Sequence, residues 1–362
     1  MTTQTLGKDN LSNTPDIDGE KNLGGLGGLS GLENTPELNG VAGDLVQDPD
    51  LEARRQFTYE AGEKLKRRVD WHLLPLLILA YLVKNMDGNV VSYVKVMNSG
   101  KSTNVLKELD ISTDQWADMS TIFTVFFFIF EIPSNLIIKW STPRLHFVRI
   151  MGSWSIVVAC TAAVKSMGGL FACRALLGAF EAGLYPGILY QLACWYRPDE
   201  IAIRMSALGL LGQFSGIIDA LLAFAYIDGK GGLSGWRWCY LILGLLGFVV
   251  TLLIFLFLPD WPDSPPSRRQ FLTPEEGTFF AARLPPNSAR STDLNFDWGA
   301  IKKELKSPIL YGFALIQMLF ASGVTGLSFW LPTVIAGFGL TSTANSQLLN
   351  IPPALPTATP RR

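Results

Sequence analysis

Histidine, cysteine and charge are all scarce in this sequence. Its 362 residues include two histidines, at positions 72 and 146, and four cysteines that stand in or beside apolar segments without CxxC spacing. Such cysteines are expected to be small buried residues rather than a disulfide framework or a zinc site. Because we find no phosphate-binding loop, nucleophile triad or metal-ligand motif in the sequence either, we predict no metal, no cofactor and no enzymatic activity.

Charged residues make up 17% of the chain, against about 25% in typical soluble domains. The net charge of -1 gives no strong attraction toward nucleic acid, so no nucleic-acid partner is expected. Hydrophobic residues make up 48% of the chain and are gathered in long blocks, which is typical of a protein embedded in a lipid bilayer. The first twenty residues lack the apolar core of a signal peptide, so the first long apolar segment is expected to lead membrane insertion.

The chain divides into a polar beginning, a series of apolar segments and a polar interruption. Residues 1–50 are rich in Gly, Asn, Asp and Thr and are predicted to be a disordered tail. Residues 51–70 are predicted to be a basic amphipathic segment at the membrane surface. About 20 apolar residues cross a bilayer, which predicts spans at 72–94, 117–138, 147–165, 168–194, 203–227, 238–258 and 309–336. The fourth span is long enough to tilt or to break at Pro186.

These spans predict an all-α membrane protein. Residues 71–258 form a predicted six-helix half, 259–308 a central loop, 309–338 a seventh helix and 339–362 a short tail. Lys and Arg are more frequent on the side that holds the N-terminus and the central loop, so both are placed in the cytoplasm. Six spans, a long cytoplasmic loop and a further span match the outline of a carrier built from two six-helix halves.

Two opposite charges interrupt the fourth apolar segment. Arg174 and Glu181 are seven residues apart, so they lie on one face of a helix, two turns and roughly 10 Å from each other. At that distance they do not pair directly, and each needs another partner or water. We favour a cavity-lining role over a packing role. Arg174 then offers a planar fork suited to a carboxylate, and Glu181 can titrate and carry a proton.

Three further acids lie in the predicted spans. Asp87 stands late in the first span, either inside the membrane or hydrated at its outer interface, and Gly88 after it can let the helix bend or admit a ligand. Glu131 lies near the end of the second span, where we predict a gating or structural contact with the loop bases Lys139 and Arg144. Asp219 is isolated in the fifth span and either lines the cavity or pairs with another helix.

Several segments together resemble a known carrier family. They are LLPLLILAYLVKNMD, FEIPSNLIIK, RALLGAFEAGLYPG, GWRWCYLILG, FLPDWPD and SFWLPTVI. Their order and spacing resemble the anion:cation symporter branch of the major facilitator superfamily, most closely the fungal allantoate-permease-like carriers. The resemblance covers roughly residues 65–354. It implies a major facilitator fold with a complete N-terminal six-helix half plus one helix of an incomplete C-terminal half.

The resemblance also implies a function. Members take up small organic anions, carboxylates or vitamins, often by proton-coupled symport, so the expected partners are such an anion and protons. The expected location is the plasma membrane, and a full-length carrier is expected to be a monomer. Such carriers have twelve spans, so this chain is expected to be a truncated form. The alternative is a non-transporting truncated, regulatory or sensor protein of the same family.

Individual residues match the family's motifs. Arg174 matches its fourth-helix arginine and Glu181 the acid two turns later, which implies binding of the substrate anion and proton coupling. We place Tyr185 with Arg174 in the predicted substrate site and Asp87 with Glu181 in proton coupling. Asp87 matches the acid of a first-helix Asp-Arg motif, in which Gly88 here replaces the arginine. The loop KWSTPRLHF also departs from the usual motif between helices two and three, because it lacks an acidic residue and a glycine.

Overall fold

Helices account for most of the residues that the computed structural model describes, which are 58–262, 272–285 and 298–338. The predicted tails at 1–50 and 339–362 both lie outside these ranges. The helices are α3 (Tyr59–Val96), α4 (Val105–Glu108), α5 (Thr113–Trp140), α6 (Pro143–Thr161), α7 (Met167–Glu181), α8 (Leu184–Trp195), α9 (Pro198–Gly212), α10 (Ser215–Ala225), α11 (Gly235–Phe257), α12 (Pro274–Arg283), α13 (Trp298–Leu305) and α14 (Pro308–Gly337). No strand occurs among the described residues, so the chain is all-α there, as the sequence predicts.

Each of the seven predicted spans is helical over most of its length. Five stretches are long and apolar enough to cross a membrane by length and composition, namely Glu60–Val96, Thr113–Ile138, Met167–Trp195, Pro198–Ala225 and Gly235–Phe257. The third and seventh predicted spans are helical too, as α6 and α14. Apolar side chains cover much of the outside of α5, where Phe128 and Ile132 are 74% and 69% exposed. Such a surface suits hydrocarbon rather than water.

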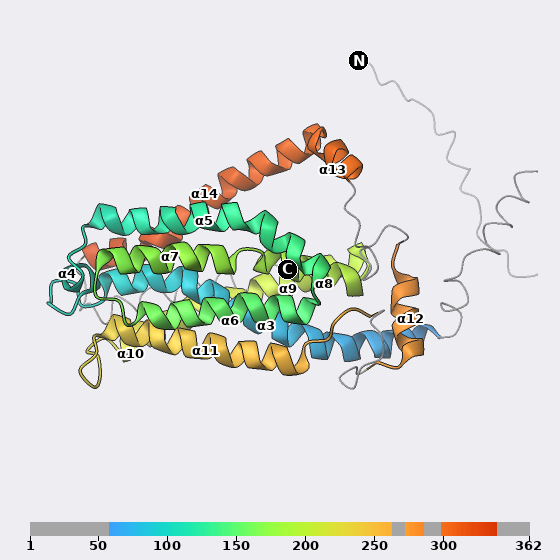
Figure 1. The fold of residues 1–362 in the computed structure, drawn as a ribbon, viewed down its shortest axis with the longest axis horizontal. Coiled ribbons are helices and arrows are strands. Elements are labelled where there is room, and N and C mark those ends of the chain that lie inside the picture. The colour runs from blue at the N-terminus through green and yellow to red at the C-terminus, as the bar shows by residue number, and fades with distance from the viewer. Residues whose placement is uncertain (1–57, 263–271, 286–297, 339–362) are drawn as a thin grey trace, which may run out of the picture. The chain divides into compact units, whose positions relative to one another are not determined.

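Helix α3 is the central element of the described bundle. It packs against α9, α10, α11 and α14, while α6 packs against α11 and α7, and α7 against α5 (Figure 1). The short helix α4 and the helix α12 lie at opposite ends of the long helices (Figure 1). We call these the α4 end and the α12 end. Helix α3 begins at Tyr59 and runs through residue 70 without a break, so the described part of the predicted surface segment continues directly into the first span.

The fourth predicted span does break, but the break lies at Ala182–Gly183 rather than at Pro186. Gly183 has φ of +91°, a left-handed conformation that glycine adopts without steric cost. Pro186 instead stands in the first turn of α8, where its missing N–H removes no helical hydrogen bond. The prediction of a break at the proline was therefore wrong by three residues. The fifth span is interrupted only at Gln213 and Phe214, between α9 and α10, and both residues keep right-handed helical backbone angles.

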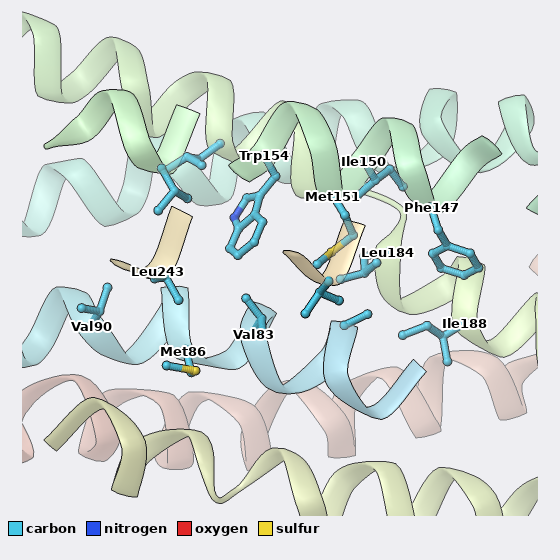
Figure 2. Close-up of a cluster of buried hydrophobic side chains, with 14 of the residues drawn as sticks. Val83, Met86, Val90, Phe147, Ile150, Met151, Trp154, Leu184, Ile188 and Leu243 are labelled. Atoms are coloured by element: carbon cyan, nitrogen blue, oxygen red, sulfur yellow. The ribbon is translucent and has the colours of Figure 1, made fainter. Parts of the chain in front are cut away.

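The core lies where α6, α3, α8 and α11 meet. Figure 2 shows Met151 and Trp154 of α6 reaching toward α3, where Val83 and Met86 are labelled. Leu243 of α11 and Leu184 of α8 belong to the same cluster, and all six side chains are almost completely buried (Figure 2). Glycines allow the closest approaches: a Cβ on Gly178 would lie 2.3 Å from the Phe123 carbonyl oxygen of α5. This observation agrees with the close helix packing that small residues permit.

Candidate functional site

Three contacts in succession join α3 to the α7–α8 pair. The rings of Tyr81 and Tyr185 lie 6.0 Å apart between centroids. Lys84 Nζ lies 3.6 Å from Glu181 Oε1, and Arg174 Nη1 lies 3.6 Å from Asp87 Oδ2. Positions three apart on a helix are neighbours on its surface, so the α3 residues form one row. We call these six residues the α3–α7 ladder.

Exposure falls along the ladder from one end to the other. Tyr185 is 46% exposed, and the Lys84 side chain is 32% exposed. Arg174 and Asp87 are only 3% and 1% exposed. The ladder therefore leads from an accessible pair of tyrosines to a charge pair inside the bundle. The partners on α7 and α8 come in reverse order along the chain, because those helices run antiparallel to α3.

Arg174 is held from two sides. Its Nη2 donates to the Tyr240 hydroxyl of α11 at 2.7 Å, and its guanidinium carbon lies 5.4 Å from the centre of the same ring. Its Nε has no hydrogen-bond partner among the described residues. An arginine has five N–H donors in a fixed fork, so this side chain keeps donors for a further anion. Tyr240 was not among the residues that the sequence singled out.

The predicted pair Arg174 and Glu181 finds its partners on α3. Each side chain faces an opposite charge one helix away, as a two-turn separation requires. Asp87 is buried between helices, which excludes the hydrated carboxylate of the second alternative. The residue after Asp87 is Gly88 rather than the arginine of the Asp-Arg motif. The cation that faces Asp87 is instead Arg174 of α7. A Cβ on Gly88 would meet nothing within 4 Å, so the helix surface is open at that point.

Glu131 does not reach the loop base Arg144. Arg144 pairs instead with Asp260, just after α11, through its guanidinium and its backbone N–H. Glu131 stands nine residues before the end of α5, which is about 13 Å at 1.5 Å per residue. Because Arg144 is paired with Asp260 in the described arrangement, the predicted gating contact of Glu131 stays a prediction. Lys139 lies in α5, but its side chain is outside the described part of the chain.

Asp219 lies on α10 and is 1% exposed. In the described ranges, neither of its carboxylate oxygens has a hydrogen-bond partner. Helix α10 packs against α3 and α11, so this acid is enclosed by helices of the described bundle. The sequence identified the residue but left its surroundings open.

Polar contacts also close both ends of the bundle. At the α12 end, Arg204 of α9 pairs with Asp70 of α3 at 2.8 Å, and Arg283 of α12 pairs with Glu200 at 2.6 Å. At the α4 end, Glu108 accepts hydrogen bonds from Arg237 and Trp236, each at 2.8 Å. None of these pairs was predicted, because the partners are far apart in sequence.

Glu108 is tuned by its partners. Burial alone raises the pKa of this carboxyl, but hydrogen bonds from Ser234, Trp236 and Arg237 outweigh burial and hold the pKa below the ordinary value of 4.5. The carboxylate is therefore the stable form at neutral pH. It joins α4 to the first turn of α11.

The model of the Major Facilitator Superfamily matches residues 73–359. The chain belongs to this superfamily. Among its relatives, an uncharacterised transporter of Schizosaccharomyces pombe is 30% identical over 82% of this chain and 58% of its own length. A protein of Agrobacterium vitis, provisionally named a tartrate transporter, is 26% identical over 83% of this chain and 62% of its own length. The chain thus spans about three fifths of these superfamily relatives.

A solved structure with a similar fold supports this assignment. The bacterial homologue of the human lysosomal transporter Spinster, in an inward-facing and unoccupied conformation, matches with a TM-score of 0.59. It covers 79% of this chain and 60% of its own, at 18% identity. The predicted major facilitator fold is confirmed. The anion:cation symporter branch and the allantoate-permease likeness stay predictions.

Proposed function

We propose that this chain serves a membrane carrier that moves a small organic anion together with protons by alternating access. The proposal rests mainly on the surroundings of Arg174. It is a buried guanidinium whose contact with Asp87, at 3.6 Å, is longer than a hydrogen bond. It donates to a neutral hydroxyl on Tyr240. Donors of this kind are suited to a substrate carboxylate, which a guanidinium binds through two parallel hydrogen bonds.

The ladder supports a path for such an anion. Tyr185 and Tyr81 stand at its accessible end, and Lys84 lies between them and Arg174. A carboxylate that enters past the tyrosines meets one cation part-way and another at the buried end. The relative provisionally named a tartrate transporter is in keeping with a carboxylate substrate. We therefore assign Arg174 and Tyr185 to substrate binding.

Proton coupling follows from the same two pairs. A substrate carboxylate that takes the Arg174 fork leaves Asp87 without its cation. A buried carboxylate without a counter-charge is costly in free energy, so Asp87 binds a proton as the anion binds. Glu181 behaves in the same way whenever Lys84 turns toward the anion. An anion is then carried with at least one proton.

The remaining assignments keep to the same proposal. The N-terminus and the α12 end face the cytoplasm, the membrane is the plasma membrane, and the full-length carrier acts as a monomer. We assign a gating or structural role to Arg144 at the α12 end, where it pairs with Asp260. Glu131 and Lys139 of α5 are assigned to the same role.

Uptake of radiolabelled tartrate and related carboxylates into proteoliposomes, driven by an inward proton gradient, tests the function. Arg174→Lys removes the two-pronged contact, which is worth about 1.5–3 kcal/mol and weakens anion binding about 10- to 100-fold. Arg197→Lys is the matched control, because Arg197 is exposed and pairs only with exposed Asp199 in the described chain. Equal uptake and KM in wild type and Arg174→Lys would remove Arg174 from the substrate site.

Glu181→Gln tests the coupling separately. We expect uptake that responds less to the proton gradient than in wild type, because only Asp87 then remains to take up a proton, measured at fixed anion concentration with and without the gradient. Anion binding with no flux in any condition would contradict transport by this chain and favour a sensor or regulatory protein.

A further inference from the structure

One buried acid has no counter-charge in the described bundle. Asp219 is 1% exposed, and neither carboxylate oxygen has a hydrogen-bond partner among the described residues. The charged group that acts on it is another acid, Asp87 of α3. Its surroundings are therefore unlike those of Asp87 and Glu181, each of which faces a cation at 3.6 Å.

The other groups around Asp219 are neutral. From α3, Asn89 and Tyr93 face it, and from α11, Cys239 does. Asn89 Nδ2 donates to Ser215 Oγ at 3.0 Å, and the Tyr93 hydroxyl donates to the Gly216 carbonyl at 3.1 Å. Both contacts hold the start of α10 against α3.

The nearest further cation along α3 points elsewhere. Lys95 is 5% exposed, and its Nζ lies 3.9 Å from the centre of the Trp330 ring of α14. The central charged cluster is thus Lys84, Asp87, Arg174, Glu181 and Asp219. It holds three acids and two bases. If every member were ionised, one negative charge would remain in the interior, and an uncompensated buried carboxylate is costly.

We propose that Asp219 is a proton-binding site, and that the central cluster holds one proton for each acid in excess of its bases. In the arrangement described, three acids less two bases leave one proton, and it resides on Asp219. The proton neutralises the carboxyl without any change in the two ladder pairs. A further role rests on the proposed carrier function. When an anion separates Asp87 from Arg174, the proton on Asp219 is the nearest one that Asp87 can take up.

Infrared spectroscopy of the purified full chain in detergent, at neutral pH and without sodium, tests the site. The carbonyl band of a protonated carboxylic acid is expected in wild type and absent in Asp219→Asn. Asp260→Asn is the matched control, because Asp260 is ion-paired with Arg144 and its loss leaves the band unchanged. Asp219→Glu keeps an acid at the position and is expected to shift the band while retaining it.

The same measurement tests the counting rule. Arg174→Gln leaves three acids and one base, so two protonated carboxyls and about twice the band intensity are expected. An identical band in wild type and Asp219→Asn would overturn the site. Loss of the wild-type band on adding sodium chloride would also overturn it, because sodium would then be the ion that binds at Asp219. An unchanged intensity in Arg174→Gln would overturn the rule. None of these readouts needs transport, so failure of the proposed function leaves the result interpretable.

Discussion

At the scale of single residues, Glu108 shows how one carboxylate can join two elements. It accepts hydrogen bonds from Ser234 at 2.5 Å, from Trp236 at 2.8 Å and from two nitrogens of Arg237. Arg237 in turn donates to the Ala162 carbonyl at 2.6 Å, after α6. Glu108 therefore joins α4 to the start of α11, and Arg237 extends this link to the residue after α6. Charge-assisted hydrogen bonds are stronger than neutral ones, so this contact depends on ionisation.

This dependence predicts a pH effect. The pKa of Glu108 lies below 4.5 in the folded chain, so the unfolded state takes up a proton first as pH falls. The contribution to stability is therefore fully present above the ordinary value of 4.5 and is lost as pH falls through the folded value. We expect Glu108→Gln to lower stability by about 1 kcal/mol at pH 7, since the pair is partly exposed, and by much less at pH 3. Thermal unfolding in detergent at both values measures the difference.

Asp228→Asn provides the control for this series. Asp228 lies near the same end of the bundle, but its side chain is 83% exposed and its Lys101 partner is 65% exposed. Its substitution is expected to leave the unfolding temperature unchanged at both values. An equal effect of Glu108→Gln at pH 3 and pH 7 would show that ionisation of Glu108 contributes nothing.

At the scale of elements, the break between α7 and α8 lets one apolar segment take two directions. Gly183 adopts φ of +91°, and a Cβ there would lie 2.6 Å from Ser134 Oγ of α5. Both the left-handed backbone and the close approach exclude a side chain. Glu181 ends α7 directly before this break. The break therefore determines the position of Glu181 in the α3–α7 ladder.

Gly183→Ala is expected to destabilise the chain by about 1–3 kcal/mol, because it adds backbone strain and a clash with Ser134. The matched control is Gly209→Ala in α9, where a Cβ would meet nothing within 4 Å. There alanine is expected to be neutral or to stabilise the helix by up to about 1 kcal/mol. The comparison is made by thermal unfolding of both variants in one detergent. A neutral Gly183→Ala would mean that the break tolerates an ordinary residue.

The helices were predictable from sequence, whereas their contacts were not. Long apolar runs reveal spans because length and hydropathy are properties of one segment. The break was assigned to Pro186 because proline disrupts helix interiors, but a proline in the first turn does not. The pairing of Arg174 with Tyr240 joins residues 66 apart, and nothing local indicates it. A local signal did exist for the ladder, since Tyr81, Lys84 and Asp87 follow at three-residue spacing in an apolar helix.

At the scale of the whole molecule, α14 is seated against α3 near the α4 end. The ammonium of Lys95 lies over the Trp330 ring at 3.9 Å, a cation–π contact that is stronger when desolvated. Lys95 is 5% exposed. The contact joins the helix at the centre of the six-helix bundle to the helix that follows the central loop. It therefore fixes the position of α14 relative to the ladder.

Disulfide trapping checks this placement. In a background without Cys160 and Cys173, Lys95→Cys with Trp330→Cys is expected to cross-link under mild oxidation, seen as a change in gel mobility after proteolysis in the central loop. Lys95→Cys with Trp140→Cys is the control, because Trp140 ends α5 at the α12 end and is 76% exposed. Equal cross-linking in both pairs would contradict the position of α14.

The pairing of the interior charges has a consequence for biosynthesis. Lys84, Asp87, Arg174 and Glu181 find one another, and Tyr240, within residues that the ribosome makes before α14. A nascent chain that has released α11 into the bilayer already carries a counter-charge for each member of both pairs. Costly charges in hydrocarbon are thus compensated early in synthesis. The bundle from α3 to α11 is expected to reach a protease-resistant state during translation, while later segments are still being made.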